Sequence, residues 1–166
     1  MTLGPRESNE PAPARLGAVV PPPLFFLVAL VAGWMLDRVW SVPLVPAQAL
    51  DATRTLGGIL VVLGFVAMAS GAFTFTRART AVFPLHPTTR LVTSGPYRFT
   101  RNPMYLGMTV ATLGTALLWN SLPTLLCVPL AVAGLQLAVI AREERFLGRI
   151  FGADYDAYRR RVRRWI

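Results

Sequence analysis

The feature that most constrains this chain is the length of its segments without charged residues. Residues 16–36, 55–76 and 102–141 contain no Asp, Glu, Lys or Arg, and the last of these segments is 40 residues long. About 20 helical residues cross the roughly 30 Å hydrocarbon core of a bilayer. The first two segments therefore each predict one membrane-spanning helix, and the third is long enough for two.

Turn-forming residues divide the third segment near its middle. Asn120 and Ser121 are followed by Pro123, and clusters of these residue types mark turns. We therefore expect antiparallel helices over 103–119 and 122–141, joined by a tight hairpin. The predicted fold class is an all-α integral membrane protein with four transmembrane helices, in which a cytoplasmic loop and C-terminal interfacial helices form any site.

The first two spans contain residues that bear on helix geometry. Three consecutive prolines at 21–23 are incompatible with a helix interior, so the regular helix is expected to begin near Leu24. In the second span, Gly57, Gly64 and Gly71 recur every seven residues. They predict a small face that a neighbouring helix approaches closely, or they only reflect the frequent use of Gly in membrane helices.

The charged residues are concentrated between and after the apolar segments. All 17 basic residues are Arg, against 8 acids, for a formal net charge of +9. Residues 77–101 contain five arginines and no acid, and residues 142–166 contain eight arginines. Arg-rich loops favour the cytoplasmic side. Both segments are expected there, and an even number of spans places both termini there too.

The same charge pattern bears on partners and on processing. Nucleic-acid binding needs a continuous solvated basic face, whereas these arginines are separated by segments of membrane length, so we expect membrane lipids and no nucleic acid. No small-residue cleavage site follows the first apolar segment, which favours an uncleaved anchor. The Pro-containing residues 1–15 predict a disordered tail, and residues 16–166 a single membrane domain.

The polar segment before the third span carries the first candidate site. Residues 86–107 read HPTTRLVTSGPYRFTRNPMYLG and include the chain's only histidine. Asn102 followed by Pro103 is typical of a helix start. A helix N-terminus attracts anions, and Arg98 and Arg101 reinforce that attraction. The segment is suited to a bound carboxylate or phosphate, or equally to a plain helix cap with arginines facing lipid headgroups.

Two adjacent acids, Glu143 and Glu144, follow the fourth span. If the helix ends there, the negative end of its macrodipole disfavours them. Either they serve a ligand, by accepting hydrogen bonds from ribose hydroxyls or by facing a cationic sulfonium, or they pair with Arg142, Arg145 or Arg98. The sequence leaves both interpretations open.

The C-terminal residues show an apolar stripe at helical spacing, formed by Tyr155, Tyr158, Val162 and Trp165. The positions between them carry Arg159, Arg160, Arg161, Arg163 and Arg164. This pattern predicts an interfacial helix with arginines directed at lipid phosphates. The single Cys127 lies in an apolar run, where a buried structural thiol is expected, and no metal site is expected.

The motifs in combination resemble the isoprenylcysteine carboxyl methyltransferase family, which belongs to a wider group of phospholipid and isoprenoid membrane methyltransferases. The resemblance covers residues 86–107 and 143–162. It is carried by His86, Leu91 to Tyr97 (LVTSGPY), Arg101 to Gly107 (RNPMYLG), Glu143-Glu144, and Phe151-Gly152 with Tyr155, Tyr158, Arg161 and Val162. It implies one membrane methyltransferase domain that uses S-adenosylmethionine on a lipophilic acceptor: an isoprenylcysteine-like carboxylate, a phospholipid amine or another isoprenoid.

The resemblance also implies residue roles. The cofactor-binding residues would be His86, Leu91, Val92, Gly95, Tyr97, Arg101, Asn102, Tyr105, Glu143 and Glu144. The catalytic candidates are Glu144 and Tyr105, as a base for an amine acceptor, and Arg161 at the acceptor end. Asn102 replaces the family's His, which keeps a hydrogen-bonding cap. Arg163 replaces a frequent Pro, which weakens the implication of a prenylcysteine acceptor.

Two other functions remain open from the sequence. A nicotinamide-dependent membrane reductase of the sterol reductase type has a similar arrangement of loop and tail. A small non-enzymatic membrane protein, whose basic ends dock anionic lipid or a partner subunit, also fits the composition. The chain lacks a G-x-G-x-x-G motif after a strand, so a soluble dinucleotide-binding domain is not expected.

Overall fold

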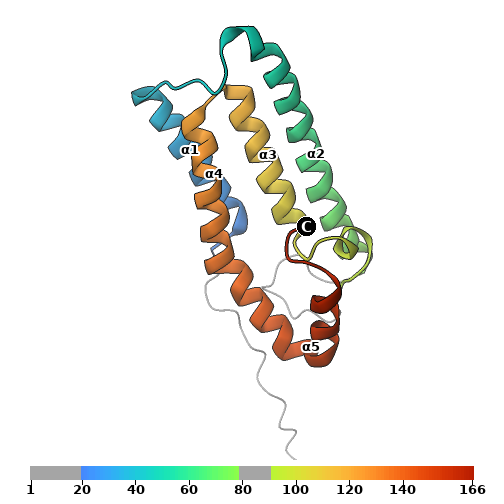
Figure 1. Cartoon of the computed structure of the whole chain (residues 1–166). Coiled ribbons are helices and arrows are strands. Elements are labelled where there is room, and N and C mark those ends of the chain that lie inside the picture. Colours follow the sequence, from blue (N-terminus) through green and yellow to red (C-terminus); the bar gives the residue numbers. More distant parts are fainter. Residues whose placement is uncertain (1–19, 79–90) are drawn as a thin grey trace, which may run out of the picture.

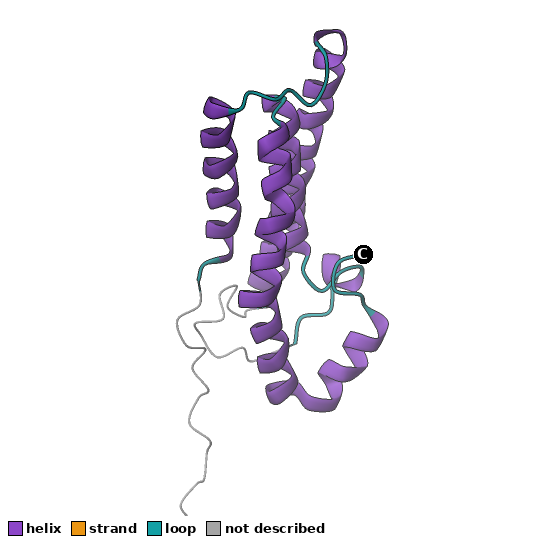
Figure 2. Cartoon of the chain, turned by 60° about the vertical axis from the view of Figure 1, so that its left-hand side comes forward, coloured by secondary structure: helices purple, strands orange, loops and turns teal. Residues whose placement is uncertain are grey.

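The computed structural model describes residues 20–78 and 91–166, and the part of the chain it describes is helical, with no strand beyond one isolated bridge (Figures 1 and 2). The helices are α1 (Pro22–Val39), α2 (Leu50–Arg77), α3 (Pro103–Trp119), α4 (Leu122–Leu135) and α5 (Ala141–Arg161). Two 3-10 turns, η1 (Ala47–Ala49) and η2 (Gly95–Arg98), and one π-helical turn, η3 (Gln136–Ile140), complete the elements. The expected tail at 1–15 and His86 lie outside the described residues.

Three helical stretches are long and apolar enough to cross a membrane: Pro22–Val39, Ala47–Arg77 and Leu122–Arg161. The first begins at Pro22, two residues before the predicted start, because a proline in the first helical turn loses no hydrogen bond. The third is 40 residues long, about twice what a bilayer core needs. Its charge-free part, residues 122–141, is the part suited to the hydrocarbon core.

The glycines of α2 lie against α3, which confirms the small-face interpretation. A Cβ atom on Gly64 would be 2.6 Å from both the Gly107 carbonyl oxygen and the Ala111 amide nitrogen. Two helical turns earlier in α2, a Cβ on Gly57 would be 2.7 Å from the Gly114 carbonyl oxygen. The two helices are thus antiparallel and in backbone contact, as small-residue interfaces allow.

The predicted hairpin between α3 and α4 is confirmed. Asn120 adopts the left-handed conformation (φ 53°) that ends α3, and Ser121 caps α4 by accepting a hydrogen bond from the Thr124 amide. The Asn120 side chain also exchanges two hydrogen bonds with the Val45 backbone, at 3.0 and 3.1 Å. The turn and the α1–α2 connection are therefore joined at this end of the bundle (Figure 1).

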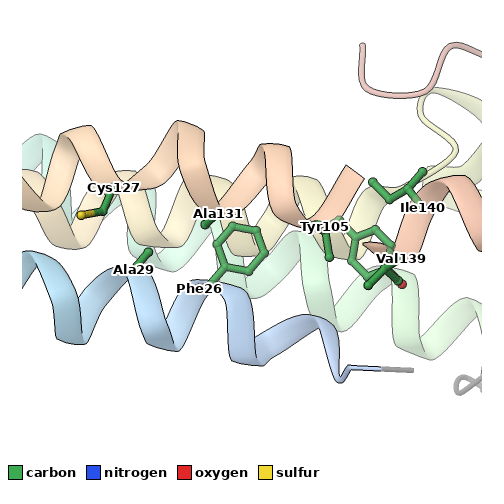
Figure 3. Close-up of a cluster of buried hydrophobic side chains, with 8 residues drawn as sticks. Phe26, Ala29, Tyr105, Cys127, Ala131, Val139 and Ile140 are labelled. Atoms are coloured by element: carbon green, nitrogen blue, oxygen red, sulfur yellow. The ribbon is translucent and has the colours of Figure 1, made fainter. Parts of the chain in front are cut away.

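Helix α4 packs on α1 around an apolar core (Figure 3). Phe26 from α1 faces Ala131 from α4, and Cys127 is buried in the same cluster, as expected for a structural thiol. The cluster continues through α4 to Val139 of η3 and reaches Tyr105 of α3. The core thus extends to the end of the bundle at which α3 begins.

The C-terminal region differs from the prediction in two ways. The helix does not end near 141, because α4 passes through the π turn into α5, so Glu143 lies within a continuous helix rather than at a helix end. The backbone bends at Gly152 (φ 48°), and α5 ends at Arg161. The helix expected to include Trp165 therefore stops four residues early, with Val162 already extended (φ −121°, ψ 128°).

Candidate functional site

The loop before α3 is fixed by contacts with α2 and α5. Gly95 has a positive φ of 59°, and a Cβ there would lie 2.8 Å from the Thr74 hydroxyl of α2. Tyr97 is buried and packs edge-to-face on Phe75, with ring centroids 5.2 Å apart. The Tyr97 carbonyl accepts a hydrogen bond from the Tyr158 hydroxyl at 2.8 Å. The loop is therefore held between α2 and the end of α5.

The start of α3 is placed as predicted but is not capped as predicted. Asn102 occupies the N-cap position and Pro103 the first turn. The Asn102 side chain makes no capping bond; its amide group instead donates to the Arg164 carbonyl at 3.0 Å. Since no described side chain caps this helix, its positive end is left for another anionic partner.

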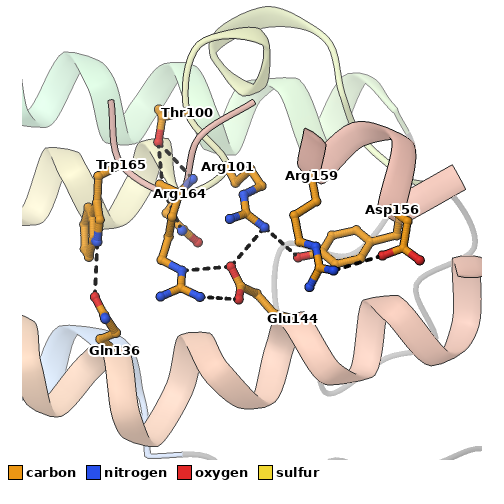
Figure 4. Close-up of polar contacts among 10 residues, drawn as sticks. Thr100, Arg101, Gln136, Glu144, Asp156, Arg159, Arg164 and Trp165 are labelled. Atoms are coloured by element: carbon orange, nitrogen blue, oxygen red, sulfur yellow. Dashed lines mark hydrogen bonds and ion pairs between the residues drawn. The ribbon is translucent and has the colours of Figure 1, made fainter. Parts of the chain in front are cut away.

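The two acids of α5 face the start of α3. The Tyr105 hydroxyl donates to Glu143 Oε1 at 2.7 Å, and Arg101 Nη1 lies 3.1 Å from Glu144 Oε1 (Figure 4). The Glu144 side chain is only 15% exposed. A polar site thus forms between the loop, α3 and α5, from segments about 40 residues apart in sequence.

The ion pairs of Glu144 differ from those considered in the sequence. Its partners are Arg101 and Arg164, rather than Arg142, Arg145 or Arg98. Arg145 is exposed and donates from Nε to a backbone carbonyl of its own helix. Arg142 and Arg145 lie two residues before and one residue after Glu144 on the same helix, a spacing at which side chains do not face each other, whereas the observed partners approach from other segments.

The site's electrostatics follow from burial. Glu143 lies beyond the charge-free 122–141 segment, and desolvation raises the pKa of its carboxyl to about 7; the nearby Glu144 charge adds to this, and the Tyr105 hydrogen bond opposes it. The carboxylate of Glu144 raises the pKa of Arg164 through their hydrogen bonds. Glu143 is thus able to change charge near neutral pH, while Glu144 is held between two guanidinium groups.

The remaining predicted residues divide into two groups. Val92 is buried, and Leu91 packs against a buried cluster of Tyr155, Tyr158 and Val162, three members of the apolar stripe. Arg161 is exposed at the last position of α5. The hydrogen bonds and ion pairs between the start of α3, the acids of α5 and the C-terminal residues thus involve Arg101, Asn102, Tyr105, Glu143 and Glu144, and among the described residues Arg161 makes none of these contacts.

Sequence reasoning missed three residues that contribute to the polar contacts between the C-terminal residues and the helices: Arg164, Trp165 and Gln136. The Trp165 indole donates to the Gln136 side chain at 3.2 Å, and Arg164 makes the bidentate contact with Glu144. One signal was present, because Gln136 is the sole amide side chain in the charge-free 122–141 segment. A polar group at such a position requires a hydrogen-bond partner.

The fold and the site define a helical membrane protein whose polar site lies at one end of its bundle. The family model described as phospholipid methyltransferase matches residues 52–154, which is more than half of the chain and includes both acids. The chain belongs to this family of membrane methyltransferases, which confirms the resemblance seen in the motifs.

Two of three similar relatives are named as methyltransferases, and the third is named as a metal resistance protein. A probable protein-S-isoprenylcysteine O-methyltransferase of Oryza sativa subsp. indica is 30% identical over 116 residues, covering 64% of this chain and 57% of the relative. The protein-S-isoprenylcysteine O-methyltransferase of Schizosaccharomyces pombe is 35% identical over 72 residues, covering 43% and 30%. The cobalt-zinc-cadmium resistance protein CzcN of Cupriavidus metallidurans is 39% identical over 72 residues, covering 43% and 33%.

These matches have a limited extent. The chain spans between about a third and somewhat more than half of the length of these relatives. No solved structure matches the chain. Helix α1 and residues 155–166 lie outside the family match, so the contacts that these parts make are read from this structure alone.

Proposed function

We propose that this protein is an S-adenosylmethionine-dependent methyltransferase that acts on a lipophilic acceptor at the cytoplasmic membrane face. The observation that carries the proposal is the pair of contacts that joins the start of α3 to the acids of α5: Tyr105 to Glu143 at 2.7 Å and Arg101 to Glu144 at 3.1 Å. Family membership supports the same reaction class.

The chemistry of these residues fits the proposed cofactor. S-adenosylmethionine carries a carboxylate, two kinds of cationic centre and ribose hydroxyls. The uncapped start of α3 and Arg101 suit the carboxylate, and Arg101 Nε is buried without a hydrogen-bond partner in the described part of the chain. Glu143 and Glu144 suit the cationic and hydroxyl groups. When bound, the cofactor supplies an electrophilic methyl group on its sulfonium sulfur.

The other candidate residues would complete the pocket. Val92 and Tyr97 of the loop before α3 are buried, and Gly95 allows this loop to approach α2 closely; we expect these residues to keep water out of the pocket. Exclusion of water strengthens every electrostatic contact in the site. We include Leu91 and His86 in this wall, although His86 lies outside the described residues.

A proton acceptor is needed only for some acceptors. A carboxylate acceptor is already ionised at neutral pH, whereas a protonated amine must lose a proton. We assign this task to Glu143, hydrogen-bonded to Tyr105, rather than to Glu144, whose carboxylate oxygens are already in contact with two arginine side chains. The raised pKa of Glu143 suits general base catalysis near pH 7. We leave Arg161 as a candidate contact for the acceptor.

The membrane arrangement proposed is four spans with the site at the cytoplasmic end. Helix α3 has 17 residues, about 25 Å of helix, and its backbone contact with the longer α2 supports a shared membrane position. An apolar groove of about 350 Å³ between α1 and α4, lined in part by Leu24, Val28 and Leu130, supports a lipophilic acceptor. The Arg-rich ends support a cytoplasmic orientation.

Titration of S-adenosylmethionine into the purified protein in detergent tests the proposal, with NADPH titrated in parallel. We expect saturable binding of S-adenosylmethionine that is greatly weakened in Glu144→Ala and in Tyr105→Phe. Asp156→Asn, which removes an exposed acid of the same helix, is the matched control and should bind normally. Binding of NADPH alone would instead indicate the reductase that the sequence left open.

A further inference from the structure

The last five residues, 162–166, form a segment that we call the C-terminal clasp. After α5 ends, the clasp runs back along the loop before α3 (Figure 1). The Arg163 carbonyl accepts a hydrogen bond from the Arg101 amide at 3.0 Å. The Arg164 carbonyl accepts two more, from the Thr100 hydroxyl at 3.1 Å and the Asn102 side chain at 3.0 Å. These bonds fix the clasp to the start of α3.

The side chain of Arg164 connects the clasp to α5. Its Nε and Nη2 atoms donate to the two Glu144 carboxylate oxygens at 2.9 and 2.6 Å. Arg101 approaches Oε1 of the same carboxylate at 3.1 Å, so Glu144 is held from the loop and from the clasp at once (Figure 4). A two-bond guanidinium–carboxylate contact fixes orientation as well as charge.

A second anchor fixes the clasp to the membrane helix. The Trp165 indole N–H donates to Gln136 Oε1 at 3.2 Å, and its ring packs against the core cluster between α1 and α4. Gln136 begins the π turn, and π turns are frequent at functional sites. The polar side chain in an otherwise apolar segment thus acquires a role, which is to hold Trp165.

We propose that the C-terminal clasp is part of the methyltransferase site and that Arg164 is a positioning residue that acts through Glu144. This inference rests on the proposed function, because it concerns the same carboxylate. Arg164 fixes the carboxylate in the orientation that Arg101 also contacts, so ligand affinity depends on Arg164 without its touching the ligand. The clasp lies beyond the family match, which ends at residue 154.

A double-mutant cycle on S-adenosylmethionine affinity tests this role. We expect Arg164→Ala to weaken binding roughly tenfold, within the range of coupling between contacting residues. In a Glu144→Gln background, the same substitution should add little further loss. Arg164→Lys should recover only part of the affinity, because Lys supplies charge but not the planar two-bond contact. Arg160→Ala, which removes an exposed arginine of α5, should bind normally.

The failures of the two proposals are distinguishable. If the original protein binds S-adenosylmethionine and the losses from Arg164→Ala and Glu144→Gln simply add, the positioning role is wrong while the proposed function stands. If the original protein does not bind S-adenosylmethionine, the proposed function fails, and with it the ligand-directed role of Arg164. Thermal unfolding of the original protein and of every variant, measured alongside, identifies any variant whose loss of binding is a loss of folding.

Discussion

Substitution of Gly64 by Ala tests the packing that positions the start of α3. The new Cβ would lie 2.6 Å from two backbone atoms of α3, which cannot rotate away as a side chain can. To restore a 3.4 Å contact, the helices must separate by about 0.8 Å. Overpacking of this kind costs about 1–3 kcal/mol, against a gain of about 1 kcal/mol in helix propensity.

The net expectation for Gly64→Ala is a loss of up to about 2 kcal/mol in the free energy of unfolding. Because the separation displaces Gly107, two residues after Tyr105, S-adenosylmethionine binding should also weaken. Gly58→Ala is the matched control, since a Cβ there meets nothing within 4 Å. Both are measured by thermal unfolding and ligand titration in one detergent. Equal stability of the two variants would refute the reasoning.

Four further predictions concern charge and hydrogen bonding. S-adenosylmethionine affinity, titrated from pH 6 to 8, should rise as Glu143 ionises around its raised pKa of about 7. The titratable groups that act on this site are Tyr105, Tyr97 and Glu144. Glu143→Gln should flatten the profile, and an unchanged profile in this variant would show that Glu143 is not the titrating group. That pKa lies above the ordinary 4.5, so the folded state binds more protons, and the free energy of unfolding should fall as pH rises from 4.5 to about 7. Tyr105→Phe should shift the midpoint of the affinity profile upward, because the hydroxyl lowers the Glu143 pKa; no shift would place the hydroxyl outside the titration. Asn120→Gly retains the left-handed turn but loses two hydrogen bonds to the α1–α2 connection. The free energy of unfolding, measured by thermal unfolding, should therefore fall by about 1–3 kcal/mol, and an unchanged melting temperature would show that these bonds do not contribute to stability.

The parts of the fold that follow from local patterns were predictable. The charge-free segments located the long apolar helices, and Asn120 located the hairpin, because membrane length and turn chemistry are properties of short stretches. The glycine repeat predicted a small helix face, and Gly64 lies in direct backbone contact with α3. Its partner helix was not predictable, because the repeat specifies a surface and not what covers it.

The features that were missed depend on contacts between distant segments. The spacing of Tyr158, Val162 and Trp165 continues a helix, yet the hydrogen bonds of the clasp to the loop before α3 end the helix at Arg161. The π turn likewise has no local sequence signal. For these reasons Arg164 was expected to face lipid, whereas it binds Glu144.

Mapping of a photo-crosslinked, labelled S-adenosylmethionine by peptide sequencing tests the central claim most directly. The proposed site predicts that label is attached within residues 86–105 or at the Glu143–Glu144 segment, and that unlabelled S-adenosylmethionine competes it away. Competable label confined to the opposite end of the bundle, around Asn120, or no competable label at all, would contradict the account.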